Sequence, residues 1–95
     1  MAKVIMFGTE YVVKPVTHTY HNGNMAVRLM GDDGSPFATL SVNLPESDTL
    51  PKDQFFVKDW SENEGLANQL LEQGEIKLVG AVPNSMDCLV YKLAN

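Results

Sequence analysis

The chain has 95 residues, of which 44% are hydrophobic and 20% are charged. This composition is typical of one folded domain and excludes a disordered chain, so we expect a single domain over residues 1–95. The formal charge of −5 at pH 7 repels nucleic-acid phosphates and anionic lipid headgroups, which argues against direct binding of nucleic acid or a membrane surface.

The first third of the chain predicts antiparallel strands. Residues 3–16 are rich in β-branched and aromatic side chains, which favours a strand pair or a bent strand that ends at Pro15. Residues 17–30 surround the dipeptide Asn22-Gly23, and both of these residue types tolerate the positive φ angles of a two-residue type I′ turn. We therefore predict a β-hairpin with this turn at Asn22-Gly23.

A second turn and two further strands follow. Residues 31–36 combine glycine, aspartate and proline, which predicts a turn, and residues 37–44 alternate as the third strand of a meander. Residues 45–53 contain two prolines and three acidic residues, which predicts a loop. Residues 54–58 are expected to form a short strand.

A helix is predicted over residues 61–73. Ser61 and Glu64 have the spacing of a capping box, in which each side chain accepts a hydrogen bond from the backbone amide of the other, so Ser61→Ala is expected to cost about 1 kcal/mol. Gly74 is placed to end the helix in a left-handed conformation. The apolar face is expected to pack on the sheet through Leu66, Leu70 and Leu71.

The last part of the chain predicts a second hairpin. Residues 75–82 and 87–93 have the composition of strands, and the segment between them contains proline, asparagine and serine. The order of elements is therefore a meander, one helix and a hairpin. This order favours an α+β fold, an antiparallel β-sheet (meander plus C-terminal hairpin) with the helix packed on one face.

The sequence carries no pattern that predicts catalysis or metal binding. His18 and His21 lie three residues apart, and on a strand they point to opposite faces, so they cannot bind one metal together. The segment 32–34 lacks the alternating oxygen ligands of a calcium loop and is interpreted as a turn. Cys88 lies in an apolar run, which favours a buried side chain over a reactive thiol. We therefore expect a non-enzymatic protein without metal or cofactor.

The acidic charge is concentrated in one segment. Residues 46–75 carry eight acidic residues and two lysines, a net charge of −6, whereas residues 1–45 are neutral and residues 76–95 carry +1. Such a segment is either a solvated face that keeps the protein soluble or a surface that binds a basic partner. For the second alternative the candidate partner-binding residues are Glu46, Asp48, Asp59, Trp60, Glu62 and Glu64.

Trp60 is the large apolar residue of this acidic segment. It either packs back on Phe55 and Phe56 or stands exposed as an anchor for a partner, because exposed tryptophans are enriched at binding hot spots. The sequence leaves both alternatives open.

Three stretches resemble a known family of small bacterial proteins. They are residues 20–29, residues 34–45 and residues 56–65, and the last contains the helix entry Lys58-Asp59-Trp60-Ser61-Glu62-Asn63-Glu64-Gly65. The family is number 4313 in the domain-of-unknown-function series, and its members look like cargo of phages and conjugative elements. The resemblance covers roughly residues 4–80 and implies no catalytic residue, because the family has no assigned chemistry.

These features together predict a protein-binding module, and the resemblance implies that it comes from a mobile element of bacteria. The expected partner is a protein with a basic surface, such as a host protein that binds nucleic acid, and inhibition of a defence system such as CRISPR or restriction machinery is compatible with this role. The alternative is an accessory structural or regulatory protein that self-associates, for instance as a homodimer through a sheet edge. A single cysteine and a start without the apolar core of a signal peptide favour the cytoplasm of the bacterial host.

Overall fold

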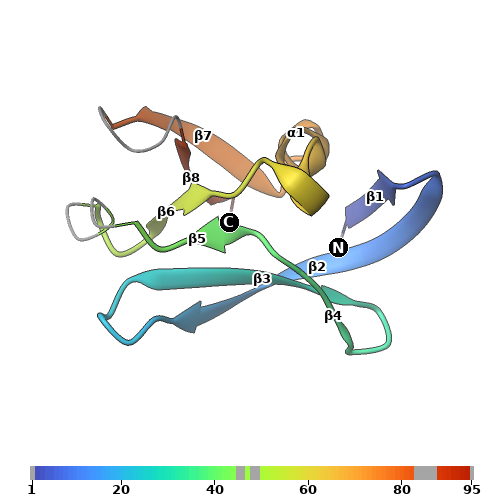
Figure 1. Cartoon of the computed structure of the whole chain (residues 1–95), viewed down its shortest axis with the longest axis horizontal. Helices are drawn as coiled ribbons and strands as arrows, with labels where there is room; N and C mark the ends of the chain where they lie inside the picture. The colour runs from blue at the N-terminus through green and yellow to red at the C-terminus, as the bar shows by residue number, and fades with distance from the viewer. Residues whose placement is uncertain (1, 45–46, 48–49, 83–87, 95) are drawn as a thin grey trace.

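Two antiparallel four-stranded sheets and one short helix make up the fold (Figure 1). The computed structural model describes residues 2–44, 47, 50–82 and 88–94. Of Glu62 it describes the backbone and not the side chain. In the first sheet the strands follow chain order: β1 (Ala2–Met6), β2 (Thr9–Thr19), β3 (Met25–Gly31) and β4 (Pro36–Thr39). Across the second sheet the order is β5 (Ser41–Val42), β6 (Gln54–Val57), β8 (Leu89–Leu93) and β7 (Ile76–Ala81). The predicted α+β class, with an antiparallel meander and a C-terminal hairpin, is confirmed.

The chain passes from the first sheet to the second at Leu40. The strand predicted over residues 37–44 is divided there into β4 and β5. Leu40 is fully buried; its amide donates to the carbonyl of Val27 at 2.9 Å, and its carbonyl accepts from the amide of Lys58 at 2.8 Å. One alternating run therefore contributes to both sheets, because the backbone of a single buried residue bonds to β3 in the first sheet and to the residue that follows β6 of the second.

A two-residue type I′ turn is predicted at Asn22-Gly23. In the structure, this type of turn occurs at Phe7-Gly8. Both of these residues have positive φ angles, 54° and 78°, and Met6 pairs with Thr9 across the turn. This is the geometry of a type I′ turn, in which Asn and Gly are the usual residues. The segment predicted as a strand pair or a bent strand is thus the hairpin β1–β2.

The hairpin at Asn22-Gly23 is confirmed, but its turn type is different. Only Gly23 has a positive φ angle in this loop, 86°. The amide of Gly23 donates to the carbonyl of Tyr20 at 2.9 Å, and the amide of Tyr20 donates to the carbonyl of Asn24 at 2.8 Å. These bonds define a longer loop with glycine in the left-handed position at its end.

Pro15 does not end the strand that contains it. β2 continues to Thr19 and pairs with β3 throughout, with Pro15 opposite Leu29. Hydrogen-bonded and non-hydrogen-bonded pairs alternate in an antiparallel ladder, and the pair Tyr20–Asn24 is hydrogen-bonded, so the nitrogen of Pro15 faces away from β3. β1 begins at Ala2, opposite Val13, so no described residue pairs with Pro15 on its other side and the missing amide interrupts no described ladder bond.

The helix predicted over residues 61–73 is correct only in its second half. Residues Ser61–Asn63 form a separate 3₁₀ turn, η2, and the helix α1 spans Leu66–Glu72, because Gly65 between them has a φ of 81°. The capping box is wrong: the amide of Glu64 donates to the backbone carbonyl of Ser61 at 3.2 Å, and no side chain caps either helix. Removing the Ser61 hydroxyl therefore loses no cap.

α1 lies beside β1 of the first sheet and β7 of the second, as Figure 1 shows, and its apolar face packs into the main core. Leu66, Ala67 and Leu70 are buried in the main core, but Leu71 is 36% exposed, so the prediction is wrong for this leucine. The short helix turns only three positions toward the core, and Leu71 lies at the margin of that face. Gly74 ends the helix as predicted, with a φ of 76° and its amide bonded to the carbonyl of Leu71.

Two glutamine side chains, Gln69 of α1 and Gln73 directly after it, cover the free edge of β1. The side-chain amide of Gln73 accepts from the amide of Lys3 at 2.8 Å and donates to its carbonyl at 2.6 Å. Gln69 does the same with Ile5, at 2.7 and 2.9 Å. The two glutamines are one helical turn apart and replace the bonds of a further strand, which closes this edge against pairing with other chains.

Candidate functional site

An apolar groove of about 230 Å³ opens between the β1–β2 turn, β4 and the start of α1. Its lining includes three aromatic side chains, and the full set is Met6, Phe7, Tyr11, Pro36, Phe37, Ala38, Asn63 and Leu66. An apolar cavity of about 150 Å³ accepts benzene, so this groove has room for an aromatic side chain of a partner. It is the strongest candidate for a binding site on the described part of the chain.

Phe7 is the most unusual residue of this groove. Its side chain is 85% exposed and its φ angle is 54°, in the left-handed region. That conformation costs a residue with a side chain roughly 1–2 kcal/mol, and a bulky residue is rare there. Phe7 bears this cost and recovers little of it through burial. Strained residues of this kind concentrate at functional sites, where the exposed side chain has a use.

Tyr11 and Phe37 hold one wall of the groove in place. Their ring centroids are 4.8 Å apart and the planes are tilted by 52°, a favourable arrangement for an aromatic pair. Tyr11 remains 38% exposed and Phe37 is half-buried, so both rings present surface to the groove. A partner would therefore meet a wall that is already ordered, which reduces the entropy lost on binding.

Asn63 attaches the acidic segment to the rim of the groove. Its side chain is 1% exposed and its Nδ2 donates to the carbonyl of Thr39 at 2.7 Å. Glu62 and Glu64 flank this buried residue in the chain, and the side chain of Glu64 is exposed. The structure thus brings the acidic segment predicted from the sequence next to an apolar groove that the sequence did not predict.

The other predicted partner-binding residues that the structure describes do not line the groove. Asp59 is exposed and its Oδ1 accepts from the amide of Gly65 at 3.2 Å, so this carboxylate bonds the backbone at the start of α1. Trp60 is 40% exposed, in agreement with the alternative of an exposed side chain. Glu46 and Asp48 lie outside the described residues.

The candidate residues predicted from the sequence did not include Phe7, Tyr11, Phe37 or Asn63. A signal for the first of them is present in the sequence: Phe7-Gly8 lies between two runs of strand-forming residues, where a hairpin turn is expected and a phenylalanine is unusual. The other three positions depend on contacts between distant parts of the chain and carry no local signal.

Among the described residues, the titratable groups offer no catalytic arrangement. Burial raises the pKa of the Tyr91 hydroxyl, and the negative charge of Asp59 adds to the shift. Hydrogen bonds from the side chain and backbone of Ser35 lower the pKa of Asp33 in the β3–β4 turn, where residues 32–34 form the predicted turn. Both effects follow from local structure. Cys88 is buried, as predicted.

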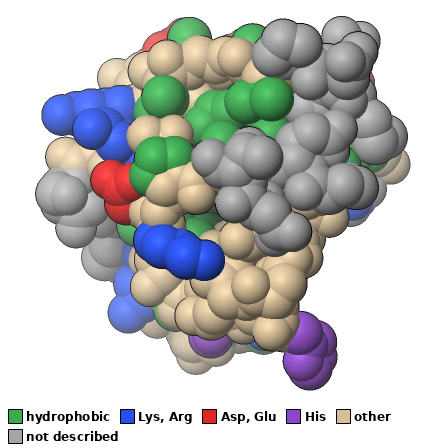
Figure 2. Space-filling view, turned by 90° about the vertical axis from the view of Figure 1, so that its left-hand side faces the viewer, with side chains coloured by type: hydrophobic (Ala, Val, Ile, Leu, Met, Phe, Trp, Pro, Cys, Tyr) green, Lys and Arg blue, Asp and Glu red, His purple; other side chains and the backbone are tan. Residues whose placement is uncertain are grey.

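The histidines lie apart from other metal-ligating residues. His18 and His21 are exposed, and Figure 2 shows histidine side chains at one end of a face without acidic side chains beside them. The described residues contain no group of three or more His, Cys, Asp and Glu side chains that could hold a metal ion. That the protein needs no metal or cofactor stays a prediction.

No family model, no curated protein and no solved structure matches the chain. The resemblance to family 4313 of the domain-of-unknown-function series therefore stays a prediction. None of the helices in the described ranges has the length and apolar character needed to cross a membrane.

Proposed function

We propose that the protein is a non-enzymatic module that binds another protein through the aromatic groove and the acidic segment beside it. The observation that carries this proposal is Phe7, an exposed aromatic side chain held in a strained conformation at the mouth of an apolar groove. The folded chain by itself recovers only part of the cost of this conformation, because most of the ring is exposed. A partner that covers Phe7 and fills the groove would recover the cost as binding energy.

The charge beside the groove favours a basic partner. Residues 46–75 carry a net charge of −6, and Asp59 and Glu64 are exposed near the attachment point of Asn63. Acidic residues around an apolar centre attract a surface with lysine or arginine around an apolar side chain, and they increase the association rate more than the affinity. The aromatic side chains of the groove, above all Phe7, would supply most of the affinity, and the exposed Trp60 of the acidic segment would be a second anchor.

The predicted origin in a mobile element suggests which proteins have such a surface. A host protein that binds nucleic acid is basic where it contacts phosphates, and an acidic module can occupy that surface in place of the nucleic acid. We therefore propose that the partner belongs to a host defence system, such as CRISPR or restriction machinery. This proposal combines the resemblance to a mobile-element family with the negative charge of the acidic segment.

Self-association through a sheet edge is the second candidate function. β7 has no further strand beside it among the described residues, and it exposes Leu78 and Val79, with Leu89 nearby on β8. However, a bulge between Leu78 and Gly80 interrupts this strand, and bulges hinder pairing between edges. We therefore favour a different protein as the partner. Sedimentation equilibrium of the purified protein would reveal a homodimer if this second candidate were correct.

The proposal is tested by affinity capture from a bacterial host lysate, followed by mass spectrometry and by titration of the purified partner. Phe7→Ala and Trp60→Ala should each weaken binding by at least about tenfold, the loss expected for a hot-spot residue. Glu72→Gln, which removes one exposed charge from the end of α1, should weaken it by less than about threefold. The association rate should fall as salt rises past about 0.1 M.

Circular dichroism and thermal unfolding verify that each variant is folded. Equal affinity for wild type and Phe7→Ala would show that the groove is not the binding surface, and equal affinity for wild type and Trp60→Ala would remove Trp60 from the interface. A captured partner whose contact surface is acidic or neutral would contradict the role of the acidic segment.

A further inference from the structure

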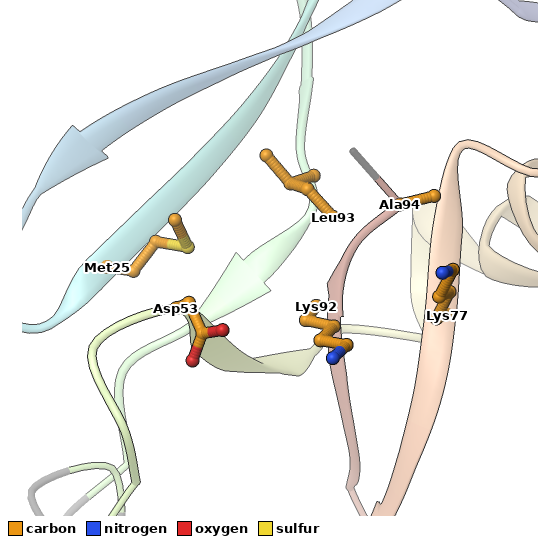
Figure 3. Close-up of a pocket in the computed structure, with 6 residues that line it drawn as sticks. All are labelled: Met25, Asp53, Lys77, Lys92, Leu93 and Ala94. Atoms are coloured by element: carbon orange, nitrogen blue, oxygen red, sulfur yellow. The ribbon is translucent and has the colours of Figure 1, made fainter.

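A second pocket, of about 270 Å³, opens beside the second sheet and is separate from the aromatic groove (Figure 3). Figure 3 shows two lysines on adjacent strands, Lys77 on β7 and Lys92 on β8, with the carboxylate of Asp53 beside Lys92. Met25 from the first sheet, together with Leu93 and Ala94, adds an apolar wall. The pocket thus combines two positive charges, one negative charge and an apolar surface.

The two lysines face each other directly in the β-ladder. Lys92 pairs with Lys77 on one side and with Gln54 on the other, so the three side chains point to the same face of the sheet. Like charges at directly opposite positions destabilise a sheet. Neither lysine forms an ion pair with a carboxylate of the described residues, so the nearby charge of Asp53 offsets this repulsion only in part.

Partial burial makes the repulsion more significant. Lys77 is exposed, but Lys92 lies in the middle of the three-strand rung and is half-buried. Charges at a partly buried site are screened less by water and salt than those on an open surface. The two ammonium groups also lie in the only part of the sequence with a positive balance, residues 76–95, in a chain of net charge −5. The positive balance of this segment favours an anion as the ligand of the pocket.

We propose that this pocket binds a phosphate group. A phosphate monoester is mostly a dianion at neutral pH, and inorganic phosphate is a mixture of monoanion and dianion. Either can therefore offset the charges of Lys77 and Lys92 together and replace their repulsion by two charge-assisted hydrogen bonds. Asp53 is placed to accept a hydrogen bond from a hydroxyl of the ligand. The apolar wall at Met25 and Leu93 would contact the organic part of an ester.

The test is a titration of the purified protein with inorganic phosphate and, separately, with glycerol 3-phosphate, followed by amide chemical shifts in NMR spectra. Saturable shifts should be concentrated at Lys77, Lys92 and Leu93. Sodium chloride at equal ionic strength should not produce them. Lys77→Gln and Lys92→Gln should each weaken binding by at least about tenfold, since each removes one charge-assisted hydrogen bond to the phosphate. Lys14→Gln is the matched control, because Lys14 is exposed on β2, away from the pocket.

A merely structural role for the lysines would give a different result. Lys77→Gln removes a repulsion, so without phosphate the variant should unfold at the same temperature as wild type or above it. Phosphate should raise the unfolding temperature of wild type and of Lys14→Gln by more than that of Lys77→Gln. Tighter binding of glycerol 3-phosphate would assign the apolar wall to an organic group, and tighter binding of inorganic phosphate would assign the site to the free ion; either result supports a phosphate site. Shifts spread over the surface, or equal affinity of Lys92→Gln and Lys14→Gln, would overturn it. None of these readouts depends on the proposed protein partner.

Discussion

Replacing Phe7 by asparagine should stabilise the fold and at the same time weaken binding of the partner. Asparagine is a preferred residue at the first position of a type I′ turn, so Phe7→Asn relieves most of the roughly 1–2 kcal/mol that the left-handed conformation costs. The lost burial is small. Only about 15% of the side chain is covered, which corresponds to about 30 Å² and about 0.7 kcal/mol.

The net gain in the free energy of unfolding is therefore about 0.5–1 kcal/mol, which in a domain of this size raises the Tm by roughly 2–8 °C. Chemical denaturation with urea, monitored by circular dichroism, measures the change in free energy directly. Phe7→Ala is the matched control, because it removes the ring but keeps a side chain in the left-handed conformation. We expect Phe7→Ala to be less stable than wild type by under about 1 kcal/mol.

The comparison of these two variants separates strain from packing. If Phe7→Asn is destabilised as much as Phe7→Ala, the ring contributes to the fold through its contacts in the groove, and the strain at Phe7 is not evidence of function. If Phe7→Asn is more stable and still binds the partner as tightly as wild type, the exposed ring is not part of the interface.

Three further predictions concern the contacts that maintain the fold. Gln73→Ala should lower the free energy of unfolding by about 1 kcal/mol and accelerate amide hydrogen exchange in β1, whose edge it uncovers; unchanged exchange would contradict the role of the glutamine. Asn63→Ala should cost about 1–3 kcal/mol in urea denaturation because the carbonyl of Thr39 loses its buried donor, whereas Asn68→Ala on the exposed side of α1 should change stability by less than about 0.5 kcal/mol. Because the pKa of Tyr91 is raised, the folded protein retains a proton that the unfolded chain loses near the ordinary pKa of 10.0. The contribution of Tyr91 to the free energy of unfolding should therefore be constant below that pH and fall as pH rises toward the raised pKa. Tyr91→Phe should remove this part of the decrease in unfolding experiments between pH 9 and pH 11, and an identical decrease in wild type and variant would show that Tyr91 is not its source.

Local patterns in the sequence were sufficient for the elements that depend on neighbours along the chain. The hairpin at Asn22-Gly23, the turn over residues 32–34 and the left-handed Gly74 follow from residues that tolerate positive φ angles. The burial of Leu66 and Leu70 follows from helical spacing. These features identified the α+β class, and the uneven distribution of acidic residues identified one side of the candidate site.

Tertiary contacts decided what the local patterns left open or predicted wrongly. Ser61 and Glu64 have the spacing of a capping box, but Asn63 bonds to Thr39 of a distant strand, and Gly65 adopts a left-handed conformation that separates the turn from the helix. The run over residues 37–44 alternates as one strand, yet Leu40 joins two sheets because its backbone bonds to both. A pattern along the chain contains no information about bonds of this kind.

The candidate site also depends partly on local sequence and partly on tertiary contacts. The sequence by itself determined that residues 46–75 are acidic and that Trp60 lies among them, since both are matters of composition. Only the tertiary structure placed Phe7, Tyr11 and Phe37 around one groove next to that segment, because they come from a turn and two strands that the fold brings together. It also placed Lys77 opposite Lys92, since the register of a hairpin fixes which side chains face each other across the strands.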